Sequence, residues 1–173
     1  MNETLNALKQ RRSCRKYQTR QVEREALDLI LEAGTYAPTG MNRQAPVIVA
    51  VQDRQTRDKI AKLNAAVMGV DTDPFYGAPT VVVVLADPAV RTYVYDGALV
   101  MGNLMNAAHA VGVDSCYIFR AKEVFATEEG RELLRAWGIP DHFEGIGNCI
   151  LGYRAEGGVK EASARKENYI IKV

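Results

Sequence analysis

Residues 80–86 read Thr-Val-Val-Val-Val-Leu-Ala and carry the clearest strand signal in the chain, which decides the class of fold. β-branched residues pack well on a pleated sheet, and an apolar run without polar alternation is typical of a strand covered on both faces. Pro79 and Pro88 flank the run and limit its length. The run therefore predicts a central strand with helices on both faces of its sheet.

Further strands and helices alternate along the rest of the chain. Short apolar runs predict strands at 47–51, 113–119 and 145–153. Apolar residues at helical spacing predict helices near 2–12, 22–34, 55–68, 90–111 and 127–137. The helix at 90–111 is rich in Gly and Ala, so we expect it to be central and flanked on several sides. The apolar end at 169–173 predicts a strand that pairs with a sheet edge, in this or another subunit.

The composition indicates one globular domain over residues 1–173. The chain is 47% hydrophobic and 25% charged, with a net charge of +1. The balanced charge argues against a nucleic-acid partner. The longest apolar run, 98–113, is broken by Asn103, Asn106 and His109 and is too short and polar to span a bilayer. Three widely spaced cysteines and an N-terminus without an apolar signal segment place the expected location in the cytoplasm.

A cationic cluster stands out against this balance. Residues 9–20 contain six basic side chains and no acidic one, and residues 11–17 read Arg-Arg-Ser-Cys-Arg-Lys-Tyr. Guanidinium groups with a hydroxyl among them are suitable hydrogen-bond donors for a phosphate oxygen or a flavin carbonyl. A solvated helix end and a nucleic-acid patch remain as alternative readings of the cluster.

Side chains for catalysis are scarce. His109 and His142 are the only histidines, and neither has a metal-like partner four residues on, so we predict no metal site. Gly145 and Gly147 lie within a predicted strand and lack the third glycine of a dinucleotide fingerprint. An anion-binding cluster with few catalytic groups suits a cofactor that performs the chemistry itself.

Four segments together resemble the nitroreductase family of FMN-dependent oxidoreductases, and the match runs over almost the whole chain. The segments are RRSCRKY at 11–17, APTGMNRQAP at 37–46, GVDSCYIF at 112–119 and ARKENY at 164–169. The resemblance implies an α+β fold with a mostly antiparallel sheet of four or five strands flanked by helices. It also implies a domain-exchanged homodimer with a C-terminal strand extension.

The resemblance further implies which residues bind FMN. Arg11, Arg12, Ser13 and Arg15 would contact the flavin of their own subunit, with Arg15 near the N1–O2 edge, where it stabilises reduced flavin. Arg165 and Lys166 would join Arg11 at the phosphate. Pro38, Thr39, Gly40 and Asn42 would approach the flavin from the partner subunit, and Asn64 would meet the pyrimidine edge.

Three of these assignments have plainer alternatives. Arg15 pairs with a nearby carboxylate in one, Asn42 fixes its own turn in another, and Asn64 lies on a wet helix face in the third.

The chain departs from the family pattern after Ile118. The family often has Gly there, whose backbone N–H meets flavin N5, whereas this chain has Phe119-Arg120-Ala121. A backbone donor does not depend on the side chain, so we expect Phe119 and Arg120 to line the substrate pocket instead. The alternative is that Arg120 points to solvent and pairs with Glu123. The short chain also lacks an evident helical lid.

The function implied is hydride transfer from NAD(P)H through bound FMN to a nitroaromatic, a quinone or an activated alkene, by a ping-pong mechanism without a catalytic side chain. Two alternatives stay open. One is a flavin enzyme of another reaction type, such as a reductive dehalogenase or a flavin-destroying enzyme. The other is a non-enzymatic binder of nucleotides or acidic peptides that uses the cluster at 9–20.

Overall fold

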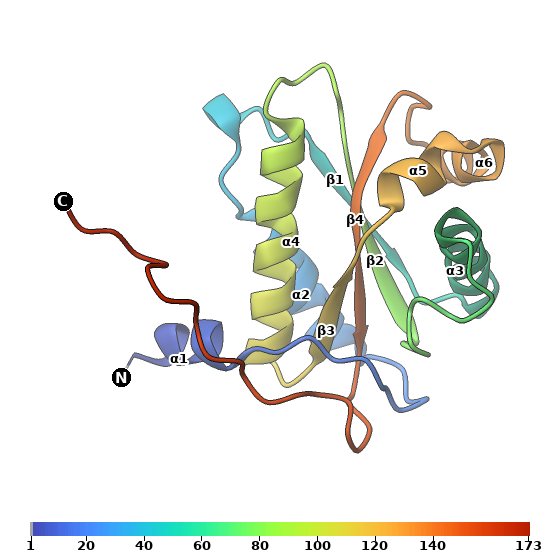
Figure 1. Ribbon diagram of the computed structural model, residues 1–173. Coiled ribbons are helices and arrows are strands. Elements are labelled where there is room, and N and C mark those ends of the chain that lie inside the picture. Colours follow the sequence, from blue (N-terminus) through green and yellow to red (C-terminus); the bar gives the residue numbers. More distant parts are fainter. Residues whose placement is uncertain (1) are drawn as a thin grey trace.

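The computed structural model describes residues 2–173 and has a four-stranded antiparallel sheet at its centre (Figure 1). The strands are β1 (Pro46–Val51), β2 (Thr80–Ala86), β3 (Asp114–Ile118) and β4 (Glu144–Gly152), in the order β1-β2-β4-β3. All three strand pairs are antiparallel. The predicted fold class is confirmed, with four strands from this chain.

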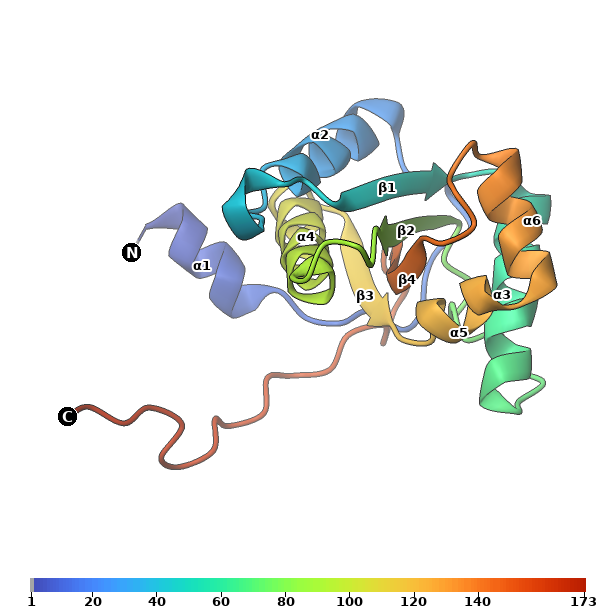
Figure 2. The same ribbon diagram turned by 90° about the horizontal axis from the view of Figure 1, so that it is seen from above.

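Helices cover both faces of the sheet (Figure 2). One face carries α2 (Arg24–Thr35) and α4 (Tyr93–Ala110), and the other carries α3 (Arg54–Met68), α5 (Ala121–Ala126) and α6 (Glu128–Ala136). The short α1 (Glu3–Gln10) lies at one end, on the same side as the C-terminal segment.

Strand β2 is buried along its whole length, as its sequence predicts. Val81, Val83 and Leu85 pack into the core under α3, α5 and α6, while Val82 and Val84 pack into the core under α2 and α4. A strand with two apolar faces is stable only between two helical layers, so this one run fixes the three-layer arrangement.

Helix α4 has one exposed side that its sequence did not predict. Its small residues do permit a close approach: a Cβ at Gly97 would lie 2.6 Å from the Ile146 side chain on β4. However, Val94, Tyr95 and Leu99 are exposed. The helix is therefore flanked by the sheet, by α2 and by α1, as expected, and its remaining side presents an open, largely apolar face.

Two other elements differ from the sequence-based expectation. Helix α5 is an additional short helix between β3 and α6. Residues 169–173 form no strand within this chain; Tyr169, Ile170 and Ile171 are exposed on an extended arm. A strand needs an edge to pair with, and this arm lies away from the sheet (Figure 1).

The loop before β2 is held by a half-buried ion pair. Arg57 on α3 donates to the Ala78 carbonyl at 2.9 Å and to Asp73 at 2.6 Å. Burial alone would raise the pKa of Asp73, but hydrogen bonds from Arg57 and from the N–H groups of Phe75 and Gly77 hold this pKa below its usual range. The pair therefore joins the loop to α3 before the central strand begins.

We expect Asp73→Asn to lower the free energy of unfolding near neutral pH by about 1–2 kcal/mol, since Arg57 loses its counter-charge and Asp73 is partly exposed. A lowered folded-state pKa stabilises the protein above the unfolded value of about 4, and this contribution is lost as the pH falls below it. The difference in the free energy of unfolding between wild type and variant should therefore be smaller in acid. Urea unfolding at pH 7 and pH 3 measures this difference, and Asp71→Asn, at an exposed carboxylate, is the control. An equal difference at both pH values contradicts the stabilising role of the Arg57–Asp73 ion pair.

Candidate functional site

A cleft of about 680 Å³ opens between α1, the segment after it and the C-terminal arm. Arg11, Arg12, Ser13, Arg15 and Arg165 all line it. Leu8, Lys9, Lys160, Glu161, Ala162 and Ser163 complete the lining. The structure thus brings together five of the residues assigned to FMN binding from the sequence, although 150 residues separate Arg15 from Arg165. Lys166 does not line the cleft; its Nζ lies 5.1 Å from the centre of the Tyr169 ring.

Backbone pairing fixes the arginine segment in place. The Cys14 N–H donates to the Ser115 carbonyl at 2.9 Å, and the Arg15 N–H donates to the Gly158 carbonyl at 2.8 Å. Between them the Cys14 side chain is fully buried, and this burial raises the pKa of its thiol. Because alternate side chains of an extended segment point to opposite sides, anchoring Cys14 inward leaves its neighbours facing the cleft.

The cleft carries net positive charge, since six Lys and Arg side chains and one carboxylate, Glu161, line it. Within residues 2–173 no carboxylate pairs with Arg11, Arg12, Arg15 or Arg165. Arg12 donates only to the carbonyls of Lys9 and Arg11, and Arg165 donates to that of Ser163. Nη1 of Arg11 is buried and has no acceptor in this part of the chain. A buried guanidinium nitrogen without an acceptor is costly, so the cleft is built for an anion.

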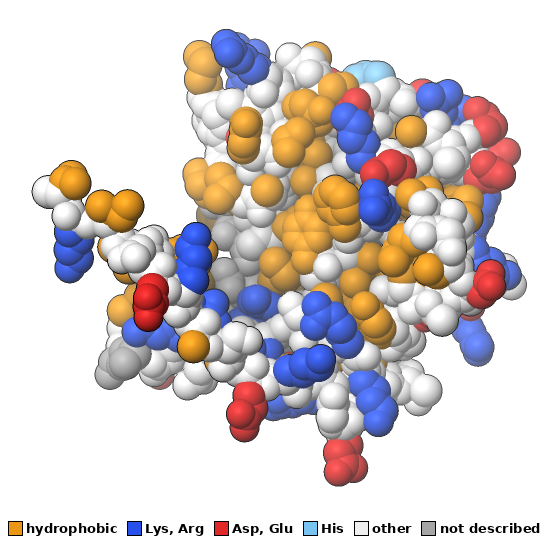
Figure 3. Space-filling view, in the orientation of Figure 1, with side chains coloured by type: hydrophobic (Ala, Val, Ile, Leu, Met, Phe, Trp, Pro, Cys, Tyr) orange, Lys and Arg blue, Asp and Glu red, His pale blue; other side chains and the backbone are white. Residues whose placement is uncertain are grey.

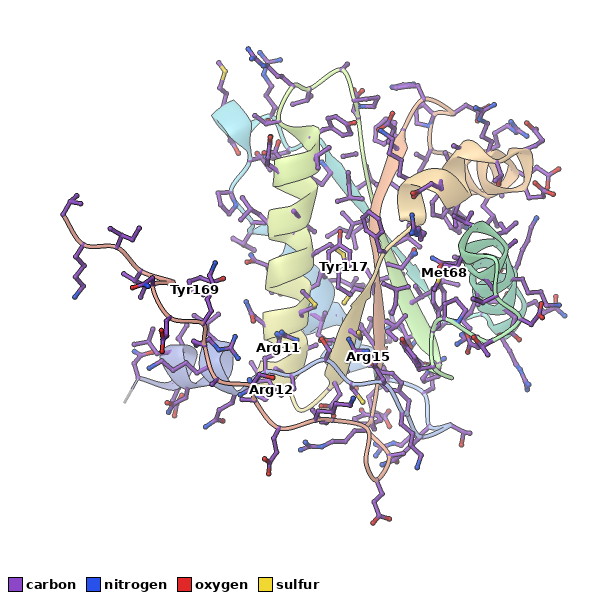
Figure 4. All side chains as sticks on the ribbon, viewed as in Figure 1. Arg11, Arg12, Arg15, Met68, Tyr117 and Tyr169 are labelled. Carbon is purple, nitrogen blue, oxygen red and sulfur yellow. The ribbon has the colours of Figure 1, made fainter. Side chains whose placement is uncertain are left out.

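Figure 3 shows where the basic surface beside the C-terminal arm meets a hydrophobic surface. Lys and Arg side chains gather in the lower part of the view, beside the C-terminal arm, and hydrophobic side chains lie above them in the centre. Figure 4 places Arg11 and Arg12 where α1 meets the C-terminal arm and Arg15 beside β3, below Tyr117. Arg15 is exposed and has no ion pair among the described residues, so its alternative role as a partner of a carboxylate is not supported.

The far end of β3 forms a sharp corner before α5. Arg120 has φ of 81°, the left-handed region that favours glycine. Its guanidinium pairs with Glu123 at 3.2 Å and lies 5.3 Å from the centre of the Phe119 ring. The structure thus contains the solvent-facing pair considered from the sequence. Phe119, at 63% exposure, forms an apolar wall next to it.

Asn64 lies beneath this corner rather than on a surface. Its side chain is fully buried on α3, and Nδ2 donates to the Phe119 carbonyl at 2.9 Å. The alternative that Asn64 lies on a wet helix face is therefore wrong. Its assignment to the pyrimidine edge of the flavin stays a prediction, and its Oδ1 is buried without a donor in the described chain. Within this chain Asn64 holds the β3–α5 corner.

The segment with Pro38, Thr39, Gly40 and Asn42 lies at the opposite end of α4 from the cleft (Figure 1). Gly40 approaches Thr92 so closely that a Cβ would collide with the Thr92 hydroxyl. Asn42 accepts from Gln44 at 3.2 Å, which supports the reading that Asn42 fixes its own turn. These four residues do not meet the cleft within one chain.

The structure adds one residue to this segment that the sequence did not suggest. Asp96 on α4 is buried and accepts from the Gly40 N–H at 3.0 Å and from the Thr92 hydroxyl at 2.9 Å. An acidic residue inside a helix usually faces solvent, so nothing in the sequence around Asp96 indicates that it is buried and bound to a distant turn. Asp96 fixes the position of the 39–42 turn on α4.

Two other kinds of feature are absent from residues 2–173. No group of three or more His, Cys, Asp or Glu side chains is arranged to hold a metal ion in this range. None of the described helices is both long and apolar enough to cross a membrane.

Comparison with known proteins agrees with this geometry. A nitroreductase with bound FMN from Bacteroides fragilis has the same fold, with a TM-score of 0.92, 30% identity and full coverage of both chains. An NADH dehydrogenase/NAD(P)H nitroreductase from Archaeoglobus fulgidus is 31% identical over 88% of this chain and 86% of its own. An NAD(P)H FMN reductase from Bacillus subtilis is 25% identical over 98% of this chain and 76% of its own. The nitroreductase family model matches residues 8–153, so the chain belongs to the nitroreductase family.

Proposed function

We propose that the protein is an FMN-dependent oxidoreductase that passes hydride from NAD(P)H to a small electron-poor acceptor. The observation that carries this proposal is that β3 connects the cationic cleft to the corner at Phe119 and Arg120. Ser13 bridges to Ser115 at one end of β3, and Arg120 follows five residues after Ser115. At about 3.3 Å per residue the two ends lie about 16 Å apart, which suits an elongated ligand with a phosphate at one end.

The residues at both ends fit FMN. The buried Nη1 of Arg11, with Arg12, Ser13 and Arg165 beside it, offers donors to a terminal phosphate. Phe119 offers an apolar wall where a flat ring would end. The related protein from Bacteroides fragilis contains FMN, which supports the same cofactor here.

Bound FMN supplies hydride acceptance and delivery at its N5 atom. The chain itself binds and orients the cofactor. Arg15 is exposed beside β3 and stabilises negative charge on the reduced ring. No side-chain acid, base or nucleophile is needed for hydride transfer, which agrees with the scarcity of such groups. Nitroaromatics, quinones and activated alkenes are the proposed acceptors, and the alternation of donor and acceptor at one site makes the kinetics ping-pong.

The active form in this proposal is a homodimer. The 38–42 segment is anchored by Asp96 but lies away from its own cleft, so it serves the flavin of the neighbouring subunit through Pro38, Thr39, Gly40 and Asn42. The open face of α4 and the apolar end of the C-terminal arm supply the surfaces for association. A cytoplasmic location, expected from the sequence, remains a prediction.

The decisive experiment examines the protein as purified. Yellow protein that releases FMN on denaturation, is bleached by NADH or NADPH without oxygen and is recoloured by an acceptor supports the proposal. Colourless protein that neither binds added FMN nor is reduced supports the non-enzymatic binder of nucleotides or acidic peptides. Release of FAD overturns the cofactor assignment, and flavin that NAD(P)H does not reduce favours another flavin reaction.

Arg120 is proposed to select the acceptor. Its ion pair with the exposed Glu123 is weak and leaves the guanidinium available to an anionic substrate. We expect Arg120→Ala to lower kcat/KM up to about fivefold for a carboxylated nitroaromatic, because an exposed ion pair contributes up to about 1 kcal/mol, and to leave the uncharged analogue unchanged. Lys122→Ala is the matched control, because the Lys122 ammonium is held by Glu144 at 2.8 Å. Equal losses with both acceptors contradict the assignment.

A further inference from the structure

The buried hydrogen bond from Asn64 to the Phe119 carbonyl has a consequence on the opposite side of the peptide. In a planar trans peptide the carbonyl of one residue and the N–H of the next point in opposite directions. Since the Phe119 carbonyl points inward to Asn64, the Arg120 N–H points outward, away from α3. This N–H has no acceptor within residues 2–173.

This orientation is unfavourable for Arg120 itself. Its φ of 81° is a conformation that a side chain disfavours. Rotating the peptide between Phe119 and Arg120 by half a turn would bring the φ of Arg120 to an ordinary negative value. The same rotation would turn the Arg120 N–H inward and the Phe119 carbonyl outward. The outward N–H is therefore kept in place by its surroundings and not by local preference.

Asn64 is the group that opposes this rotation. It is fully buried, so water does not compete for its amide, and Nδ2 donates to the carbonyl that would have to leave. Its Oδ1 is buried without a donor in the described chain. If the peptide rotated, the Arg120 N–H would point inward and meet this oxygen. The Asn64 side chain could therefore bond the peptide in either orientation, and the hydrogen bond from its Nδ2 to the Phe119 carbonyl favours the observed one.

We propose that Asn64 is a positioning residue that holds the peptide between Phe119 and Arg120 with its N–H directed outward, where it donates to the flavin. The inference rests on the proposed function for the identity of the ligand. The orientation of the peptide is a property of the chain alone and can be measured without FMN.

The first test is amide hydrogen exchange at Arg120 in the apoprotein. In wild type the outward N–H should exchange within tenfold of an unprotected amide. Once the introduced carboxyl is ionised, Asn64→Asp presents only acceptors and favours the rotated peptide. Above the pKa of this carboxyl, exchange at Arg120 should therefore be at least tenfold slower, relative to an unprotected amide at the same pH, than in wild type. Unchanged exchange in this variant contradicts the proposal.

The second test is FMN affinity, measured by fluorescence titration. Asn64→Leu removes donor and acceptor and should weaken FMN binding about threefold to tenfold, as for the loss of one neutral hydrogen bond. Adding Arg120→Gly removes the cost of positive φ and should restore most of the affinity, which a general defect of the core would not allow. If Asn64→Leu does not fold, Asn64→Ser replaces it in the same titration, because the shorter side chain also loses the hydrogen bond to the Phe119 carbonyl.

Asn148→Leu is the matched control. Asn148 is also a fully buried asparagine, lies opposite Ile118 in the ladder and has neither amide atom paired in the described chain. Its replacement should change FMN affinity less than twofold. A wild type without FMN affinity refutes the proposed function but leaves the exchange test valid. If the wild type binds FMN and both Asn64→Leu and Asn148→Leu bind it with the same affinity, only the positioning role of Asn64 is refuted.

Discussion

Removal of residues 169–173 is expected to give a monomer that purifies without flavin. These residues carry four large apolar side chains, Tyr169, Ile170, Ile171 and Val173, that are exposed in the single chain. Full burial contributes about 1.5–3 kcal/mol for each such side chain, so burial of only some of them from each subunit stabilises a dimer by on the order of 10 kcal/mol. Dissociation constants in the nanomolar to micromolar range correspond to a similar free energy.

The truncation leaves the phosphate cleft intact, which separates its two consequences. Arg165 lines the cleft and is retained, so flavin loss follows from the missing partner subunit and not from the missing arginine. Ile170→Ser with Ile171→Ser in the full-length chain should reproduce the monomer, and Arg165→Ala should remain dimeric with weaker FMN binding. Light scattering and the ratio of flavin to protein absorbance measure both effects. A truncated monomer that retains stoichiometric FMN contradicts the composite site.

The sheet and most helices could be predicted from the sequence because their signals are local. The run at 80–86 has apolar side chains on both faces, and only a covered central strand satisfies them. Helix α5 carries no such signal because six residues are too few to show periodicity. Thr127 ends α5 by donating to the Val124 carbonyl and then starts α6 by accepting from Gly130. The sequence predicted only the second of these helices, at 127–137.

The cleft was predictable in part, for a related reason. The arginines at 11–15 form one run, but their convergence with Arg165 depends on how the last segment returns to α1. The resemblance to a known family supplied that pairing, since no local pattern could do so. The open face of α4 was missed because small residues predict close packing but not which side of the helix is packed.

Asn64 and Asp96 show the limit of sequence reasoning most clearly. Both are polar residues on helices, which usually face solvent. Each is buried because it satisfies a backbone group from a distant segment: the Phe119 carbonyl for Asn64 and the Gly40 N–H for Asp96. Such partners arise only from tertiary structure. The left-handed conformation of Arg120 has the same origin, since its sequence favours the opposite sign of φ.

Arg11 offers the sharpest test of the cleft, because its replacement should change binding and stability in opposite directions. Its buried Nη1 has no acceptor in the described chain, so the apoprotein bears the cost of burying it. We expect Arg11→Met to raise the free energy of unfolding of the apoprotein by about 1 kcal/mol, because an apolar side chain of similar length removes this cost. The same change removes a charge-assisted hydrogen bond to the phosphate, about 1.5–3 kcal/mol, and should weaken FMN binding tenfold to more than a hundredfold.

Arg12→Met distinguishes this effect from a general loss of positive charge. Nη1 of Arg12 already donates to the carbonyls of Lys9 and Arg11, at 2.7 Å each. Its loss should therefore destabilise the apoprotein by about 0.5–1.5 kcal/mol, the opposite sign to Arg11→Met. Urea unfolding of both apoproteins and FMN titrations of both variants complete the comparison. If Arg11→Met destabilises the apoprotein and leaves FMN affinity unchanged, the Arg11 guanidinium supports the fold and the phosphate is bound elsewhere.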